Sequence, residues 1–251
     1  MAQYFTDFGE YTSDVAPTGW TSPFAGDDTF LVVASVVEGV TGGKVLILEN
    51  GFTTLESTTW SALGVLSGDV EVLAKVRDTN AFSAHPDVVG RSWYNSSGVI
   101  LHAEPTTNRR YEGGWRFNGD GLTQIRKKDE SDTLTTLSSF EAAAPKWSPD
   151  TEWSFFRLRR EGTTLKYSWW RSGETEPVDW QQTVTDSDFD SGEVGILVAG
   201  GSRGVAADFF SVGTDGDSAP STAPSTSPNT PINPSITSLL ATSAHLNWEQ
   251  G

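Results

Sequence analysis

Apolar and polar residues alternate in short segments along most of the chain, and glycine, asparagine, aspartate or serine residues separate these segments. The clearest segment is 69–77, in which Val70, Val72, Ala74 and Val76 occupy alternate positions. Because successive side chains of a strand point to opposite faces, this period of two predicts a strand with one buried face. The same pattern, or a short apolar run, predicts further strands over 29–37, 44–48, 88–94, 99–103, 111–118, 122–128, 151–160, 163–171, 181–185, 192–199 and 205–212.

Helical periodicity is confined to 138–144, where we expect the one helix of the chain. Turn formers join neighbouring strands at 160–163 and at 119–121, and both places predict hairpins. Many short strands connected in this way are typical of all-β proteins whose two sheets pack face to face. We therefore expect an all-β fold, an antiparallel two-sheet jelly-roll sandwich.

The composition divides the chain into three parts. Residues 1–213 hold the predicted strands and form the predicted sandwich domain. Residues 214–235 are rich in proline, serine and threonine and have little to bury, which predicts an extended linker. Residues 236–251 turn apolar again and resemble the first two strands of a fibronectin type III domain. Either this last segment is part of a truncated domain, or it is a short β-arm that docks on another chain.

The chain is strongly acidic: its 251 residues include 17 Lys and Arg against 33 Asp and Glu, for a net charge of -16. This charge repels phosphate backbones, so we expect no nucleic-acid partner. The acidity serves solubility, or it reflects a high-salt environment or a cation-binding surface, and these interpretations stay open.

Several other features limit the compartment and the chemistry. Cysteine is absent, which excludes disulfides, thiolate nucleophiles and Cys-ligated metals. The opening residues, MAQYFTDFGEY, lack the pattern of a secretory signal peptide. No stretch approaches the ~18 apolar residues of a membrane span, so we expect no membrane insertion.

An ordered set of features lies between Trp153 and Val212: WSFFRLRREGTTLKYSWW, the turn RSGETEP, then VDWQQTVTDSDFDSGEVGILVAGG and finally VAADFFSV. This set resembles the laminin G-like branch of the concanavalin A-like lectin/glucanase superfamily. The opening YFTDFGEYTSDVAPTGWTSPF resembles the first strand of such domains in bacteriophage virion proteins. The resemblance implies one convex and one concave sheet, adjacent first and last strands, and glycan binding at the concave sheet or its edge loops, although many members are purely structural.

Catalytic motifs are missing from the places where this resemblance would put them. The resemblance implies that a glucanase of the superfamily would carry two glutamates as E-x-D-x-x-E on one strand, with both carboxylates in the cleft. The nearest segment, 130–135, lacks the second glutamate. No G-x-S-x-G elbow accompanies His85, His102 or His245, and we interpret His102 as a hydrogen-bonded residue of an apolar strand. We therefore expect that the protein is not an enzyme.

Metal binding has two candidate places. Segment 186–190 has the D-x-D-x-D start of an EF-hand loop, but Ser191 and Leu197 stand where that loop needs glycine and glutamate, which excludes an EF-hand. Many laminin G-like domains hold one structural Ca²⁺ at an edge of the sandwich, whereas a solvated acidic loop is the simpler alternative. No cofactor is required, and the calcium candidates, by position only, are Asp27, Asp28 and Asp208.

Aromatic residues are the main lead to a ligand. Exposed aromatic faces bind the apolar C–H faces of sugars, while nearby polar groups bond the hydroxyls. Neighbours in a strand point to opposite faces, so each single tryptophan is either core or ligand contact. By this rule Leu165, Tyr167 and Trp169 share one face, and Trp170 lies on the other. The glycan-binding candidates are Trp93, Tyr94, Asn95, Trp115, Arg116 and Trp170.

Together these features favour a non-catalytic structural or adhesion protein on the surface of a virion, in a phage tail, tail fibre or capsid decoration. Such a protein leaves the cell by lysis and needs no signal peptide. Its expected partners are other virion proteins, further copies of itself in a symmetric homo-oligomer, and host surface polysaccharide. The alternative is a glycan-active hydrolase, or a carbohydrate-binding module of a secreted enzyme.

Overall fold

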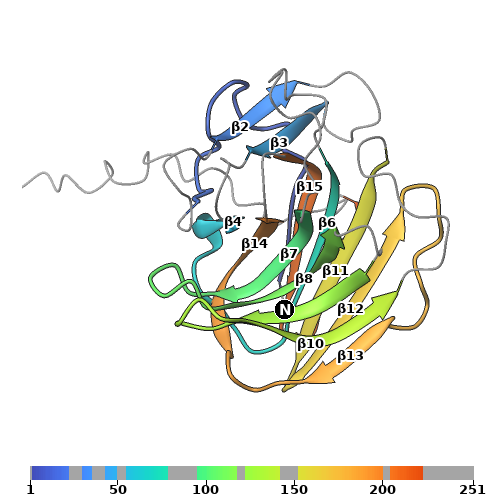
Figure 1. Ribbon diagram of the computed structural model, residues 1–251. Coiled ribbons are helices and arrows are strands. Elements are labelled where there is room, and N and C mark those ends of the chain that lie inside the picture. The colour runs from blue at the N-terminus through green and yellow to red at the C-terminus, as the bar shows by residue number, and fades with distance from the viewer. Residues whose placement is uncertain are drawn as a thin grey trace, which may run out of the picture.

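The computed structural model describes residues 2–22, 30–35, 43–49, 55–78, 95–117, 122–141, 152–199 and 204–222. Two antiparallel β-sheets pack face to face in a jelly-roll sandwich (Figure 1). Helical structure in this part of the chain is one 3-10 turn, η1 (Ser61–Leu63), and no helix described there is long and apolar enough to cross a membrane. The predicted all-β, antiparallel two-sheet fold is confirmed.

Within the described residues, one sheet has eight strands in the order β13-β12-β11-β6-β15-β3-β2, and β1 also pairs with β15. The first and last strands of the sandwich are therefore adjacent, as the sequence resemblance implies, with Gln3 opposite Gly213. The strands of this sheet are β1 (Gln3–Thr6), β2 (Phe30–Ser35), β3 (Lys44–Glu49), β6 (Val70–Asp78), β11 (Ser154–Glu161), β12 (Thr164–Arg171), β13 (Gln182–Thr185) and β15 (Gly204–Thr214).

The other sheet has seven strands in the part of the chain that the structure describes, in the order β10-β9-β8-β7-β14-β4, and the short β5 pairs with β14. Strands β8 and β9 pair antiparallel, as expected for strands on either side of a hairpin, although residues 118–121 lie outside the described part. The strands are β4 (Leu55–Thr59), β5 (Leu66–Ser67), β7 (Asn95–Ala103), β8 (Arg110–Phe117), β9 (Leu122–Lys128), β10 (Leu134–Glu141) and β14 (Ser191–Ala199).

The core lies between the two sheets and follows the period-two pattern of the sequence. Tyr167 and Trp169 of β12 pack there with Phe156 of β11. Trp170 belongs to a separate cluster with Leu73 and Phe209 on the outer face of the eight-stranded sheet, which is the face turned away from the other sheet. The predicted division of the two neighbouring tryptophans between faces is confirmed.

A glycine in β8 lets the two sheets approach each other closely. A Cβ atom on Gly113 would lie 2.7 Å from Cδ2 of Tyr167 and 3.2 Å from Cβ of Leu158. The Tyr167 ring is fully buried, so it has no free space into which to move. This position therefore fixes how deeply β12 packs onto the seven-stranded sheet.

The predicted helix over 138–144 is wrong, because Leu134–Glu141 forms the edge strand β10. Its pairing with β9 shifts by one residue between Thr136 and Ser138, which is a β-bulge. Of the apolar residues of β10, Leu137 packs against the core, whereas Leu134 and Phe140 are exposed. Residues 142–144 lie outside the described part.

The chain does not leave the domain at the end of β15. Residues 215–219, which we call the strap, fold across the outer face of the eight-stranded sheet and bury Ala219 beside Phe5 and Trp170. The amide of Ala219 donates a hydrogen bond to Glu71, and the amide of the Gln3 side chain donates one to the Ser218 carbonyl. The beginning of the predicted linker 214–235 is thus packed against the sandwich. The predicted strand 88–94, the rest of the linker and the segment 236–251 lie outside the described residues.

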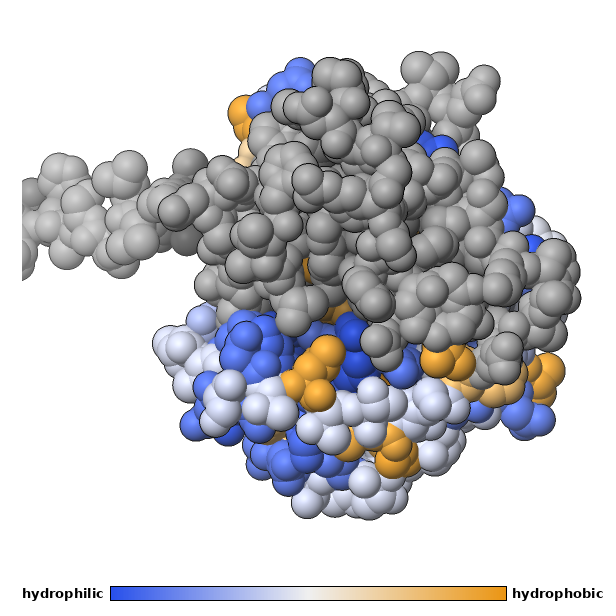
Figure 2. Space-filling view, viewed as in Figure 1, coloured by the Kyte–Doolittle hydropathy of each residue, from blue (hydrophilic) through white to orange (hydrophobic). Residues whose placement is uncertain are grey.

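The surface visible in Figure 2 is mainly hydrophilic where it is coloured, with isolated apolar residues between charged and polar ones. Among the described residues the most exposed large apolar side chain is Val178, at 98% of its full exposure. It lies in the turn 172–181 between β12 and β13.

Candidate functional site

The structure places Trp170, the sequence-predicted sugar platform on β12, under other side chains. Its ring is only 6% exposed and stacks on Phe155 with 5.0 Å between ring centroids. The guanidinium of Arg157 lies over the same indole, 5.8 Å from its centroid. In this arrangement Trp170 supports an arginine and does not present an open face to a ligand.

The other predicted glycan contacts are only partly placed. Asn95 pairs with Phe117 across β7 and β8, and Trp115 and Arg116 lie further along β8, opposite Ser97 and Ser96. The backbone thus brings these three candidates to adjacent strands of the seven-stranded sheet. Trp93 and Tyr94 lie outside the described residues. The glycan-contact roles of all five remain predictions.

Among the calcium candidates, Asp208 is the one that falls in the described part of the chain. It is completely buried, and its carboxylate accepts a hydrogen bond from Lys75 Nζ at 2.6 Å. Within the described residues no group of three or more His, Cys, Asp or Glu side chains is arranged to hold a metal ion. Asp27 and Asp28 lie outside those residues, so calcium binding stays a prediction.

His102 has the structural role that the sequence predicts. Its Nδ1 lies 3.2 Å from the carbonyl oxygen of Phe189, and the side chain is fully buried. Burial lowers the pKa of His102 to about 4, because a charged imidazolium would lose its hydration there. The residue is therefore neutral at neutral pH.

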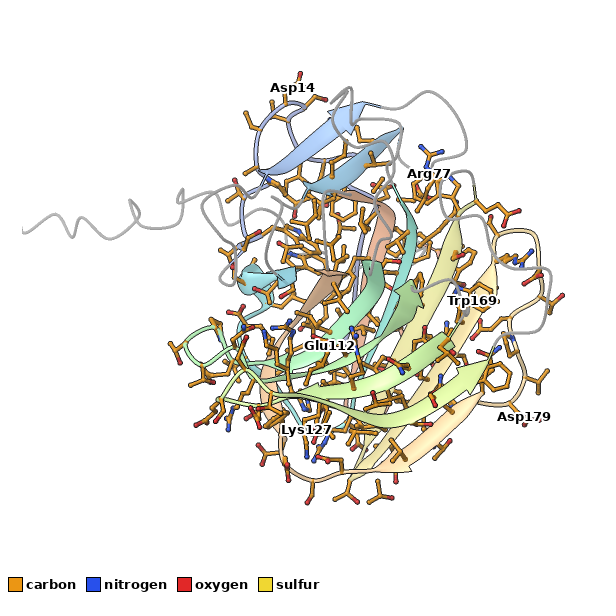
Figure 3. The ribbon with its side chains drawn as sticks, in the orientation of Figure 1. Asp14, Arg77, Glu112, Lys127, Trp169 and Asp179 are labelled. Atoms are coloured by element: carbon orange, nitrogen blue, oxygen red, sulfur yellow. The ribbon has the colours of Figure 1, made fainter. Side chains whose placement is uncertain are left out.

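Charged residues also gather on the seven-stranded sheet, where Figure 3 labels Glu112. Its carboxylate lies 2.9 Å from Arg110 Nη2 and 2.7 Å from Arg126 Nη2, and these three side chains are almost fully buried. Burial is the largest single influence on this carboxyl and raises its pKa, but the charges of Arg126, Arg110 and Lys128 and the hydrogen bond from Arg110 together lower the pKa of Glu112 below its usual value. The carboxylate is thus held ionised between two guanidinium groups.

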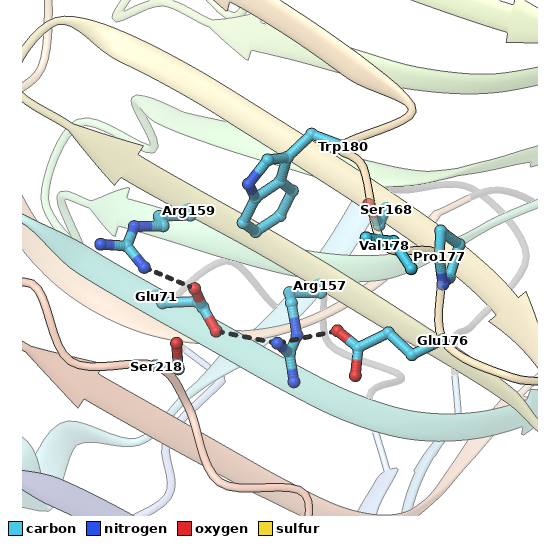
Figure 4. Close-up of a pocket in the computed structure, with 9 residues that line it drawn as sticks. All are labelled: Glu71, Arg157, Arg159, Ser168, Glu176, Pro177, Val178, Trp180 and Ser218. Atoms are coloured by element: carbon cyan, nitrogen blue, oxygen red, sulfur yellow. Dashed lines mark hydrogen bonds and ion pairs between the residues drawn. The ribbon is translucent and has the colours of Figure 1, made fainter.

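A pocket that the sequence analysis missed opens on the outer face of the eight-stranded sheet (Figure 4). Its volume is about 220 Å³. It combines charged side chains from two adjacent strands with an indole from the turn 172–181. The lining residues are Glu71, Arg157, Arg159, Ser168, Glu176, Pro177, Val178, Trp180 and Ser218.

Strand register places the charged groups of this pocket. Arg159 of β11 lies directly opposite Glu71 of β6, and Arg157 lies two residues along the same strand, so both arginines share the outer face. The turn 172–181 then returns over β12 and brings Glu176 and Trp180 to the pocket. Ser218 comes from the strap.

The two carboxylates of the pocket differ in accessibility although one arginine contacts both. Nη1 of Arg157 lies 3.5 Å from Glu71 and 2.8 Å from Glu176, whose side chains are 1% and 37% exposed. Arg159 Nη1 holds the second oxygen of Glu71 at 3.2 Å. Burial is the largest influence on Glu71 and raises its pKa, while Arg157, the Ala219 amide and Arg159 act in the opposite direction.

The pocket offers a specific set of chemical groups. The Trp180 indole provides an apolar face, and the arginine, glutamate and serine side chains provide hydrogen-bond donors and acceptors close to it. One signal in the sequence could have indicated this site. The charged residues Glu71, Arg157 and Arg159 lie in the middle of predicted strands, at the alternate positions that point away from the core.

No protein-family model and no curated protein sequence matches the chain. Solved structures do match in fold. A protein of unknown function from Shewanella oneidensis aligns with a TM-score of 0.52 at 11% identity, covering 84% of each chain. A β-glucanase from Bacillus licheniformis aligns with a TM-score of 0.50 at 9% identity, covering 84% of this chain and 98% of that one. The GH43 protein BlXynB from the same organism has a TM-score of 0.50 at 13% identity, and the match covers 83% of this chain and 38% of that longer one.

These likenesses show that the chain shares the two-sheet jelly-roll fold of these structures. The structural neighbours contradict the prediction that the chain is not an enzyme, because proteins that share its fold include glycoside hydrolases. That prediction rested on a missing motif within one strand. The pocket, however, takes its carboxylates from β6 and from the turn 172–181, and no single-strand motif detects such a pair. These structural neighbours are glycoside hydrolases and a protein of unknown function, so the virion role stays a prediction.

Proposed function

We propose that this protein acts on glycans, as a glycoside hydrolase or as the carbohydrate-binding module of one, and that the pocket beside Trp180 binds a saccharide unit. The observation that carries the proposal is the position of Trp180. This indole lies in a small pocket whose other walls are charged and polar, on the outer face of a jelly-roll sheet. The hydrolase fold of the structural neighbours supports the proposal.

Saccharides suit this combination of groups. A pyranose ring has an apolar C–H face that packs on an indole, and its hydroxyls need several directional polar partners. Ser168, Glu176 and the two arginines offer such partners within one small volume. The volume of about 220 Å³ is enough for about one sugar ring, so the adjoining sugars of a chain would lie outside the pocket. A pocket of this size favours the end or a branch of a glycan as the bound unit.

A panel of plant, fungal and bacterial polysaccharides tests both versions. Binding is measured by affinity electrophoresis, and cleavage is measured by the release of reducing ends. Trp180→Ala should weaken binding strongly in either version. Release of reducing ends that is lost in the Trp180→Ala variant would select the hydrolase version, and binding without any release of reducing ends would select the module version. If no polysaccharide binds, the proposal is wrong.

A further inference from the structure

We propose that the Trp180 pocket selects saccharides that carry a carboxylate, such as uronate residues, and that Glu176 occupies the place of this carboxylate in the ligand-free protein. The inference deepens the proposed function and rests on it.

Arg157 is held rigidly at the base of the pocket. Its Nη1 contacts Glu71, its Nη2 donates a hydrogen bond to the Ala219 carbonyl at 3.5 Å, and its guanidinium lies over the Trp170 indole. The side chain is 13% exposed. A guanidinium fixed in this way is prepared for a planar, oxygen-bearing partner, and carboxylates match its fork geometry best. In the view of Figure 4, Arg157 lies between the carboxylates of Glu71 and Glu176.

Glu176 is the pocket carboxylate that can leave. Its side chain is 37% exposed, and it lies in the turn 172–181, where Val178 is almost fully exposed. A partly exposed ion pair contributes little to stability, so moving Glu176 into water costs little. Glu71, in contrast, is 1% exposed and also accepts a hydrogen bond from the Ala219 amide at 2.9 Å, so it stays in place.

The charge balance then favours an anionic ligand. With Glu176 in place, the lining residues include two arginines and two glutamates. When Glu176 turns outward, Arg157 keeps only Glu71, which it shares with Arg159. Arg159 also contacts Glu161, which is in turn paired with Lys166, so three cations then face two carboxylates and one positive charge is left without compensation. A ligand carboxylate restores the balance at Arg157, while the sugar ring that carries it packs against Trp180.

The net charge of -16 opposes anionic ligands at long range. Salt screens this repulsion beyond about 8 Å at physiological ionic strength, whereas the contact with Arg157 is direct. The preference for a carboxylate should therefore be stronger at 0.15 M salt than in salt-free buffer. At a site that attracted anions only through long-range electrostatics, added salt would instead weaken the binding of the acidic ligand.

The test uses short oligosaccharides of galacturonate, glucuronate and mannuronate, each compared with its carboxyl-reduced form by isothermal titration calorimetry. We expect the protein to bind at least one acidic form at least about tenfold more tightly than its reduced form, the effect of a charge-assisted contact. Arg157→Lys keeps the charge but loses the fork, and it should remove most of this preference.

A matched pair of variants in one turn separates competition from general charge effects. Glu176→Gln should tighten binding of the acidic form by about two- to fivefold, because the internal competitor becomes neutral. Glu174→Gln makes the same charge change in the same turn, where its partner is the Arg171 amide and not the pocket, so it should leave the affinity almost unchanged. Both substitutions lie on the surface, so both variants should fold.

Equal affinity for acidic and reduced oligosaccharides would overturn the inference and leave the proposed function standing. Weaker binding of the acidic form by Glu176→Gln, or an equal gain from Glu174→Gln, would also overturn it. If neither acidic nor neutral saccharides bind, the proposed function itself fails, and that result is distinct from a loss of carboxylate preference.

Discussion

Replacing Gly213 by alanine would place a methyl group where the strap crosses β15. The new Cβ would lie 2.3 Å from the Asp217 oxygen, 2.7 Å from the Ser218 carbonyl carbon and 2.9 Å from the Ala219 nitrogen. All three are backbone atoms, so no side-chain rotation relieves the contact. The strap must shift, or it must detach from the sheet.

The structure indicates which of these responses costs less. Detachment would break the hydrogen bonds that join the strap to Gln3, Glu71, Arg157 and Arg159. At about 0.5–1.5 kcal/mol each, their loss would cost more than the ~1–3 kcal/mol typical of overpacking. We therefore expect Gly213→Ala to lower the free energy of unfolding by about 1–3 kcal/mol, with the strap displaced but still attached.

Urea unfolding measures this change, and amide hydrogen exchange at Ala219 measures the displacement directly. Exchange at Ala219 should speed up in the variant, because its hydrogen bond to Glu71 lengthens. Combining Gly213→Ala with Glu71→Gln should cost less than the sum of the two single changes, because both weaken the same contact. Unchanged stability together with unchanged exchange at Ala219 would refute the close crossing of strap and strand.

Three further predictions concern other parts of the sandwich. Because burial lowers the pKa of His102 to about 4, against 6.5 for the free group, the unfolded chain binds more protons between these values. The free energy of unfolding should therefore fall as the pH drops from 6.5 towards 4, by on the order of 3 kcal/mol from this residue. Asparagine tolerates the φ of 50° at this position, so His102→Asn should fold and should make the stability measured by urea unfolding depend less on pH over that range. Gly113→Ala should destabilise the protein by about 1–3 kcal/mol in the same assay, through contact with the Tyr167 ring, and an unchanged midpoint would contradict the packing described for β8. Trp180→Ala should weaken saccharide binding by about tenfold in calorimetry while changing the unfolding free energy by less than ~0.5 kcal/mol.

Local alternation in the sequence was enough to predict which residues of a strand face the core. In β12 it assigned Tyr167 and Trp169 to one face and Trp170 to the other, and the structure agrees. The reason is physical, since the pleat of a strand fixes side-chain direction whatever its partner is. The sequence analysis was wrong at β10, where it predicted a helix over 138–144 and the structure has a strand with a bulge between Thr136 and Ser138.

The candidate pocket depends on contacts that no local pattern contains. Glu71 and Arg159 meet across two strands that are 88 residues apart in sequence. Only the order of strands in the sheet makes them neighbours, and sequence alone does not give that order. The sequence did indicate the stretch around the turn 172–181, but it favoured Trp170, which Phe155 covers, over Trp180, which lines the pocket.

The pairing of β1 with the end of β15 determines how the sandwich would respond to mechanical load. The amide of Thr214 donates a hydrogen bond to the Ala2 carbonyl at 3.0 Å, so the two chain segments enter and leave at the same end of one strand pair. A force applied at Ala2 and at residue 222 would first pull on the strap and then open the β1–β15 ladder one hydrogen bond at a time. Strands pulled in this unzipping direction yield at lower force than strands pulled past each other along their length. Tension would therefore deform the Trp180 pocket, through Ser218 and Glu71, well before it disrupts the core between the sheets.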